Sequence, residues 1–251
     1  MKVLSIFCWI IIFSASFIPG LRAQELTDTA RLYRELAVLQ TGYKDKPVSY
    51  DMRYSYASEL HPDIVLDSMK GSVSIYNNVY KYQLDNMETV ATGTYNIVLF
   101  KEEKVMYIVK PATASSLAPL DHVRKMMNDA GVHGYTIKED GREKTVHINF
   151  VQGASCREME VVVDKKTQRL QTIQYVIKTS LLMQESPDME AKTIAEYGPF
   201  AIVTQSFTHY QPLTTVPDWL DTAHFFYKDG TELKTAPAYN EFKIFKGSPN
   251  L

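Results

Sequence analysis

The sequence predicts an α+β protein in which one strongly curved antiparallel sheet of roughly nine to eleven strands carries two helices on one face. Three observations support this fold class. Two segments repeat apolar residues at helical spacing, many others alternate apolar and polar residues, and turn residues separate consecutive strands. The 251 residues include 45% hydrophobic and 22% charged residues, so a disordered or collagen-like chain is excluded.

The first 23 residues have the three parts of a secretory signal peptide. Lys2 precedes an apolar run over residues 3–18, and small residues end the segment at Ala23. The run is shorter than the roughly 20 residues of a membrane-spanning helix. We therefore expect cleavage after Ala23, which leaves residues 24–251 as a single domain with a C-terminal extension from about residue 212. An uncleaved N-terminal anchor is the alternative.

The charge and the cysteine count of the chain exclude several classes of function. Lys and Arg number 27 against 29 Asp and Glu, which leaves no basic excess for nucleic acid. Of the two cysteines, Cys8 lies in the signal segment and Cys156 remains alone in the mature chain. A disulfide framework and a four-cysteine zinc site are therefore excluded.

A helix and an antiparallel meander fill the first half of the mature chain. Residues 27–29 can cap a helix whose apolar residues recur from Leu32 to Leu39 and which ends at Gly42. Apolar and polar residues then alternate over 48–57, and His61-Pro62-Asp63 interrupts the pattern. The further strands predicted in this half are 69–75, 80–84, 95–100 and 105–109, with a hairpin turn at Asn77-Asn78 between the first two.

A second helix and a second meander follow. Apolar residues at helical spacing predict a helix from Leu120 to Met127 that Gly131 ends. Residues 185–196 are predicted to be a loop or a short helical insert. The strands predicted in this half are 135–138, 145–150, 156–163, 170–179 and 201–210, and the tail adds short apolar segments at 225–227 and 242–245.

The sequence contains no recognisable catalytic motif. Cys156 and His147 would form a nucleophile and base only if their strands placed them together, and a half-buried structural cysteine is the simpler interpretation. His133 with His147 is the one metal site considered, and histidine spacing does not favour it. The prediction is therefore a protein that is not an enzyme, with no catalytic residue, no metal site and no cofactor.

Tyrosine is unusually frequent, with 16 residues, all after the signal segment. Tyrosine combines a large apolar ring with a polar tip and suits the lining of a partly wet cleft. It is also an ordinary strand former that packs under helices. Both interpretations stay open for the tyrosines of the first predicted strands, which are Tyr50, Tyr54, Tyr56, Tyr76, Tyr80, Tyr82 and Tyr95.

The order of these elements resembles the LolA family of Gram-negative periplasmic lipoprotein carriers. The segments that carry the resemblance are 32–39, 48–56, 71–75 with Tyr80-Lys81-Tyr82, and 159–164 leading to Leu170, within about residues 27–210. The resemblance implies a half-open β-barrel with helices packed on its concave face. The family's arginine–proline pair should fall at residues 78–81, where the chain has Asn78-Val79-Tyr80-Lys81, so no arginine is carried over.

What the resemblance implies is a monomeric periplasmic carrier or chaperone that holds a lipid, an acylated protein or another apolar ligand between sheet and helices. An inner- or outer-membrane envelope protein would be its partner. The hydrophobic cavity would be lined by Met52, Tyr54, Val73, Ile75, Tyr82, Ile97, Leu99, Met126 and Met127. The alternative is a non-enzymatic scaffold of a cell-envelope assembly with a filled core, which would expose the tail aromatics Trp219, Phe225, Phe226 and Phe242.

Overall fold

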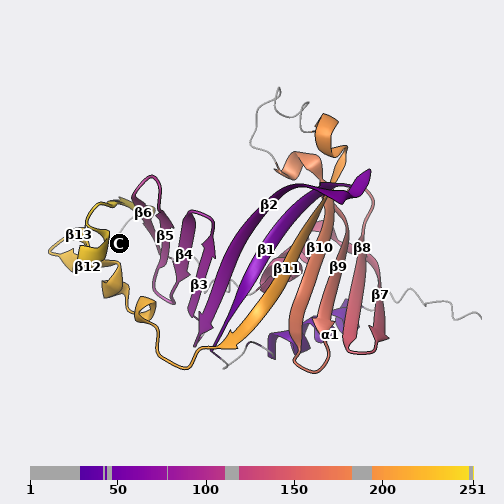
Figure 1. Cartoon of the computed structure of the whole chain (residues 1–251), viewed down its shortest axis with the longest axis horizontal. Helices are drawn as coiled ribbons and strands as arrows, with labels where there is room; N and C mark the ends of the chain where they lie inside the picture. The colour runs from indigo at the N-terminus through magenta and orange to yellow at the C-terminus, as the bar shows by residue number, and fades with distance from the viewer. Residues whose placement is uncertain are drawn as a thin grey trace, which may run out of the picture.

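The computed structural model describes residues 29–41, 43, 47–77, 79–110, 119–182, 194–248 and 251 (Figure 1). The predicted signal segment and most of the predicted insert at 185–196 lie outside these residues. The two long helices are α1 (Thr29–Thr41) and α2 (Pro119–Ala130), and the structure also has a short helical turn at residues 194–197 and four 3₁₀ helices among the described residues. The strands are β1 (Val48–Ser58), β2 (His61–Tyr76), β3 (Val79–Leu84), β4 (Met87–Ala91), β5 (Asn96–Phe100), β6 (Val105–Val109), β7 (Val132–Asp140), β8 (Glu143–Phe150), β9 (Cys156–Asp164), β10 (Arg169–Lys178), β11 (Phe200–Pro212), β12 (Phe226–Asp229), β13 (Glu232–Thr235) and β14 (Lys243–Lys246).

Twelve of these strands form one large, curved and open sheet (Figure 1). The curved sheet is as the sequence predicts, and it has more strands than the nine to eleven expected. Their order is β14-β6-β5-β4-β3-β2-β1-β11-β10-β9-β8-β7. Every neighbouring pair is antiparallel except β14 with β6, which is parallel. The long strands β1, β2 and β11 therefore lie in the middle of the sheet and join its two meanders.

Three strands differ from the sequence prediction. β2 begins at His61, so the expected interruption at residues 61–63 is only a turn at Glu59 and Leu60. β4 is absent from the prediction because Glu88 and Thr89 break its apolar pattern. β14 returns from the end of the chain to lie beside β6, a long-range pairing that no local pattern signals.

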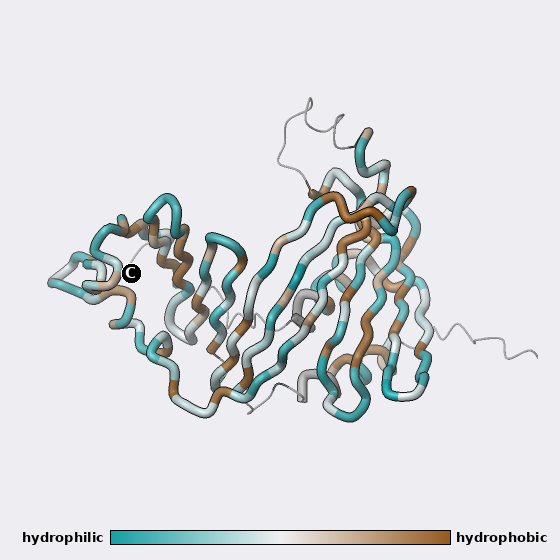
Figure 2. Tube along the Cα trace, in the orientation of Figure 1, coloured by the Kyte–Doolittle hydropathy of each residue, from teal (hydrophilic) through white to brown (hydrophobic). Residues whose placement is uncertain are grey.

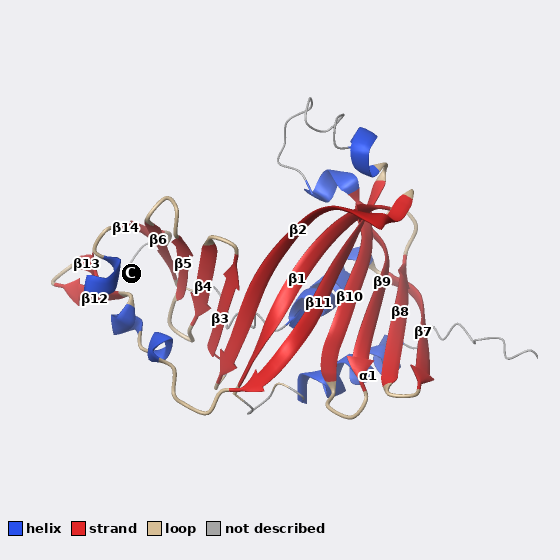
Figure 3. Ribbon diagram, in the orientation of Figure 1, coloured by secondary structure: helices blue, strands red, loops and turns tan. Residues whose placement is uncertain are grey.

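The two helices lie on one side of the sheet, behind the strands in the view of Figure 3. Leu32 and Leu36 are one helical turn apart on α1 and fully buried, as are Val123 and Met127 on α2. These side chains belong to the same core as the sheet residues beneath them. Tyr33 of α1 donates a hydrogen bond to Asn128 Oδ1 of α2 at 2.6 Å, which joins the helices to each other.

The two faces of the sheet can be followed on β1. Tyr50, Met52 and Tyr54 point to the side on which the helices pack, called here the helix face. Asp51 and Arg53 point to the other side, called the reverse face, and are exposed. This alternation is the one that the sequence predicts for a strand with one buried face.

Over β4, β5 and β6 the sheet buries its reverse face instead. Residues that alternate with the helix-face positions of these strands form a second core, in which Ile97, Leu99, Met106 and Ile108 pack with Trp219, Phe225 and Phe226 from the tail. Figure 2 shows the hydrophobic residues gathered on this part of the sheet. The chain beyond β11 therefore covers the reverse face of β4–β6 before β14 joins the sheet.

The tail is built from short elements that bury aromatic rings. Tyr95, just before β5, meets Phe226 edge-on at 5.4 Å between ring centroids, and Phe225 lies 5.4 Å from Tyr239. Trp219, Phe225 and Phe226 are buried and Phe242 is partly buried. The tail aromatics therefore do not form the exposed apolar surface that the scaffold alternative expects.

Candidate functional site

Seven of the nine residues predicted to line a cavity meet in one layer of the helix face. Met52, Val73, Ile75 and Met127 are buried in the helix-side core, and Tyr54, Tyr82 and Met126 are partly buried against it. They come from β1, β2, β3 and α2. The structure therefore brings these side chains together between the sheet and the helices.

The other two predicted residues, Ile97 and Leu99, belong to the second core on the reverse face. The register explains the difference. Met52 pairs with Gly71, and the row continues through Leu84 and Met87 to Phe100. Phe100 and, two residues earlier, Val98 thus occupy the helix face of β5, so placing Ile97 and Leu99 beside Met52 is wrong. Both faces of β5 are apolar, and the sequence alone favours neither.

The tyrosines supply the polar atoms of this layer. Tyr54 and Tyr82 hydrogen-bond to each other across Gly71. Gly71 carries no side chain, and a Cβ there would lie 2.2 Å from the carbonyl oxygen of Gln83. A substitution at Gly71 would therefore separate β2 from β3.

Several polar side chains in or beside this layer are not among the predicted lining residues. Gln205 of β11 and Tyr175 of β10 are both buried and lie diagonally across from each other in this strand pair. The apolar alternation of Ala201, Val203 and Phe207 indicates that Gln205 points to the core. Tyr50 is 2% exposed, and its hydroxyl has no hydrogen-bond partner in the described structure.

An aromatic cluster closes one end of the layer. The ring of Tyr50 lies 4.9 Å from Tyr210 and 5.9 Å from Phe207 between centroids. The hydroxyls of Tyr43 and Tyr210 are 2.9 Å apart. Tyr43 accepts from the backbone N–H of Leu170 at 3.0 Å, and Tyr210 donates to the Leu170 carbonyl at 2.9 Å. This network satisfies Tyr43 and Tyr210, whereas the Tyr50 hydroxyl beside it has no partner among the described residues.

Burial keeps these phenols neutral. Desolvation is the largest cause that raises the pKa of Tyr50, Tyr82, Tyr175 and Tyr210 above the usual value. The unfolded chain would ionise them near pH 10. Because the folded state resists this ionisation, the stability they contribute is present below pH 10 and falls as the pH rises above it. At neutral pH the layer therefore carries no charge. It consists of apolar side chains with a few uncharged hydroxyl and amide groups.

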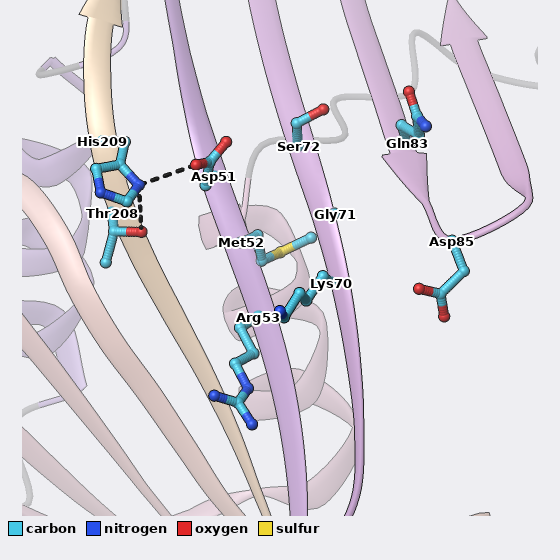
Figure 4. Close-up of a pocket in the computed structure, with 10 residues that line it drawn as sticks. All are labelled: Asp51, Met52, Arg53, Lys70, Gly71, Ser72, Gln83, Asp85, Thr208 and His209. Carbon is cyan, nitrogen blue, oxygen red and sulfur yellow. Dashed lines mark hydrogen bonds and ion pairs between the residues drawn. The ribbon is translucent and has the colours of Figure 1, made fainter.

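A separate groove on the reverse face is polar (Figure 4). It has a volume of about 540 Å³ and is lined by Asp51, Met52, Arg53, Lys70, Gly71, Ser72, Gln83, Asp85, Thr208 and His209. His209 has a φ of 53° and lies where the β1–β11 register shifts, a β-bulge that turns its ring toward Asp51. His209 Nδ1 is 2.9 Å from Asp51 Oδ2. The charged side chains of the groove are exposed, so its lining holds no buried acid, base or nucleophile.

Cys156 and His147 lie on opposite faces of the sheet. Cys156 is buried in the helix-side core, whereas His147 on β8 points to the reverse face beside Glu158 and Glu160, at 3.6 and 4.0 Å. The nucleophile–base hypothesis is therefore wrong. Burial raises the pKa of the Cys156 thiol to about 12, the opposite of an activated nucleophile.

We expect the Cys156 thiol to be inert in the folded protein. In a chain without residues 1–23, an aromatic disulfide reagent at pH 8 should titrate no thiol until urea unfolds the protein, when one thiol reacts, because only the thiolate attacks. Absorbance of the released thiol measures this directly. Full reaction within seconds without urea would contradict the buried position.

Two further findings bear on the class of site. Among the residues that the structure describes, no three histidine, cysteine, aspartate or glutamate side chains gather as metal ligands. In the same part of the chain, no helix has the length and hydropathy needed to cross a membrane.

Comparisons with known proteins give distant structural neighbours. No protein-family model matches the chain, and no curated protein matches its sequence. An uncharacterized conserved protein from Thermus thermophilus is similar with a TM-score of 0.43 and 10% identity, over 75% of this chain and 92% of that one. A DUF1329 family protein from Desulfovibrio piger has a TM-score of 0.36 and 10% identity, over 78% and 99%.

A LolA superfamily protein from Nitrosomonas europaea is also similar, with a TM-score of 0.33 and 9% identity over 74% of this chain and 96% of that one. Similarity at this level concerns the general arrangement of the chain and carries no function to it.

Proposed function

We propose that the mature chain is a carrier or chaperone that binds a lipid, an acylated protein or another apolar ligand between the sheet and its two helices. The observation that carries this proposal is the buried hydroxyl of Tyr50, for which the described part of the chain supplies no hydrogen-bond partner. A buried hydroxyl without a partner costs about 1–3 kcal/mol. A hydroxyl or ester oxygen of a ligand bound in this layer would accept its hydrogen bond and remove that cost.

The chemistry of the layer fits such a ligand. Binding sites for small molecules are mostly apolar and contain a few polar groups that fix orientation. Here the apolar part is formed by Met52, Val73 and Ile75, and the polar part by Tyr50, the Tyr54–Tyr82 pair and Gln205. Met126 of α2 is partly buried and has a flexible side chain that adapts to different ligand shapes.

The same proposal covers the parts of the fold that frame the ligand. The sheet would form a half-open barrel with α1 and α2 on its concave face, and residues 24–251 would act as one domain with an extension from about residue 212. Residues 1–23 would direct the chain to the periplasm and be removed. The protein would work as a monomer without cofactor or catalytic residue and meet an envelope membrane protein for loading or release.

The proposal is tested by identifying any small molecule that stays bound to the protein during purification. The chain is purified from the periplasm without detergent, weighed intact by native mass spectrometry, and extracted for lipids. We expect a mass increment that matches an extracted lipid or acyl species. Tyr50→Phe should lower the ligand occupancy roughly tenfold through the lost hydrogen bond, while the midpoint of urea unfolding of the ligand-free protein stays the same or rises.

Tyr227→Phe is the matched control. Tyr227 on β12 is exposed, so losing its hydroxyl should leave both the occupancy and the unfolding midpoint unchanged. A clean ligand-free mass after gentle purification, with no uptake of added phospholipid, would contradict the proposal. Equal occupancy in Tyr50→Phe and the unchanged chain would remove the observation on which it rests.

A further inference from the structure

The helix face of the sheet does not end at the tyrosine layer. On β5, β6 and β14 it carries an apolar strip, defined here as Val98, Phe100, Val105, Tyr107, Val109 and Phe245. Phe100 and Tyr107 are each 39% exposed and Phe245 is 51% exposed. The reverse face of the same strands is filled by the tail. β5 and β6 are therefore apolar on both faces, and the described part of the tail covers only the reverse one.

The strip continues the tyrosine layer without a break. One row of paired residues runs across seven strands, from Tyr50 through Val73, Tyr82, Thr89, Val98 and Tyr107 to Phe245. At about 4.8 Å between neighbouring strands, the row is about 29 Å long. No residue of this row is charged.

The last strand of the row comes from the tail. β14 pairs in parallel with β6 and places Phe245 beside Tyr107. Gly247 follows, and a Cβ there would lie 2.4 Å from Cζ of Tyr107, so the absent side chain leaves room for the tyrosine ring. The tail thus lengthens the apolar face by one strand in addition to covering the reverse face.

The shape of the strip favours a narrow chain over a protein. A specific protein interface buries about 800 Å² on each partner and involves roughly 20 to 30 residues a side. The strip has six residues, and its three valines are already partly buried. A single hydrocarbon chain laid across the strands needs no more width than this and no polar partner.

We propose that the apolar strip holds the distal part of a long-chain acyl group of a lipid whose polar end lies at the tyrosine layer. This inference rests on the proposed function and adds a direction and a length to it. The acyl chain crosses β3, β4, β5 and β6 and ends at Phe245. The C-terminal extension therefore sets the longest chain that the protein holds along its whole length.

Chain-length selectivity tests this assignment. Unlabelled saturated fatty acids from octanoate to stearate displace a fluorescent fatty acid from the full mature chain. The affinity of the unchanged protein for the fatty acid should rise by up to about fourfold for each methylene group added to the chain. Phe245→Ser should bind octanoate as the unchanged protein does and bind stearate about tenfold more weakly. Val98 lies two strands before Phe245 in the row, so Val98→Ser should weaken the binding of shorter fatty acids than Phe245→Ser does.

Tyr227→Ser is the control, since it removes an exposed aromatic ring from β12 and should not change the profile. If the unchanged protein binds fatty acids and Phe245→Ser has the same length profile, the strip is not the acyl site and the proposed function stands. If both serine variants lose affinity equally at all lengths, the strip assignment is also overturned. If the unchanged protein binds neither the probe nor any fatty acid, the proposed function fails and this inference fails with it.

Discussion

Replacing Phe225 by alanine is expected to destabilise the protein by about 3–5 kcal/mol, the largest effect that we predict for a single substitution. Phe225 is 0% exposed in the second core, where its ring contacts His224 and Tyr239. Truncation removes the ring that anchors the tail to the reverse face of β4–β6. Urea unfolding followed by circular dichroism measures the loss, and brief trypsin digestion shows whether β14, with Lys243 and Lys246, becomes accessible.

Tyr227→Ala is the companion variant, because Tyr227 lies two residues further along and is 48% exposed. Its unfolding free energy should stay within about 0.5 kcal/mol of the unchanged protein. A loss below about 1 kcal/mol for Phe225→Ala would mean that the tail contributes little to the core of β4–β6. Contacts other than those of Phe225 would then have to hold β14 beside β6.

Replacing Leu36 by alanine should cost about 2–5 kcal/mol. Leu36 is 0% exposed in the core that α1 shares with the sheet, and Glu35 beside it forms an ion pair with Lys144 of β8. The lost methyl groups leave a cavity under the helix that rigid strands cannot fill. The midpoint of urea unfolding measures the change.

Val38→Ala on the same helix provides the comparison. Val38 is 47% exposed, and alanine favours helix more than valine does. Its stability should therefore be unchanged or slightly higher. If the two alanine variants of α1 were equally stable, α1 would not be packed on the sheet in solution, and the layer between sheet and helices would lose one of its walls.

The sequence by itself determined the elements whose two faces differ in chemistry. On β1, Tyr50 and Met52 alternate with Asp51 and Arg53, and only one arrangement hides the first pair from water. On α1, Leu32 and Leu36 recur at helical spacing, so the buried side of the helix follows directly. The predicted lining residues on β1, β2, β3 and α2 were found together for the same reason.

The local sequence pattern does not predict the buried face of a strand that is apolar on both faces. It also does not predict which distant segment a strand pairs with. β5 has apolar residues at four successive positions. The register with β4 places Val98 on the helix face and Ile97 on the reverse face, where the tail buries it. The bulge at His209 and the pairing of β14 with β6 likewise depend on contacts between distant segments.

The candidate site shows the same division. Its apolar lining follows from period and composition, which are properties of single strands. The unpaired hydroxyl of Tyr50 and the row that ends at Phe245 exist only when seven strands are in register. Alternation fixes which side of a strand is apolar, but the energy of burial depends on what covers that side, and here the covering elements come from opposite ends of the chain.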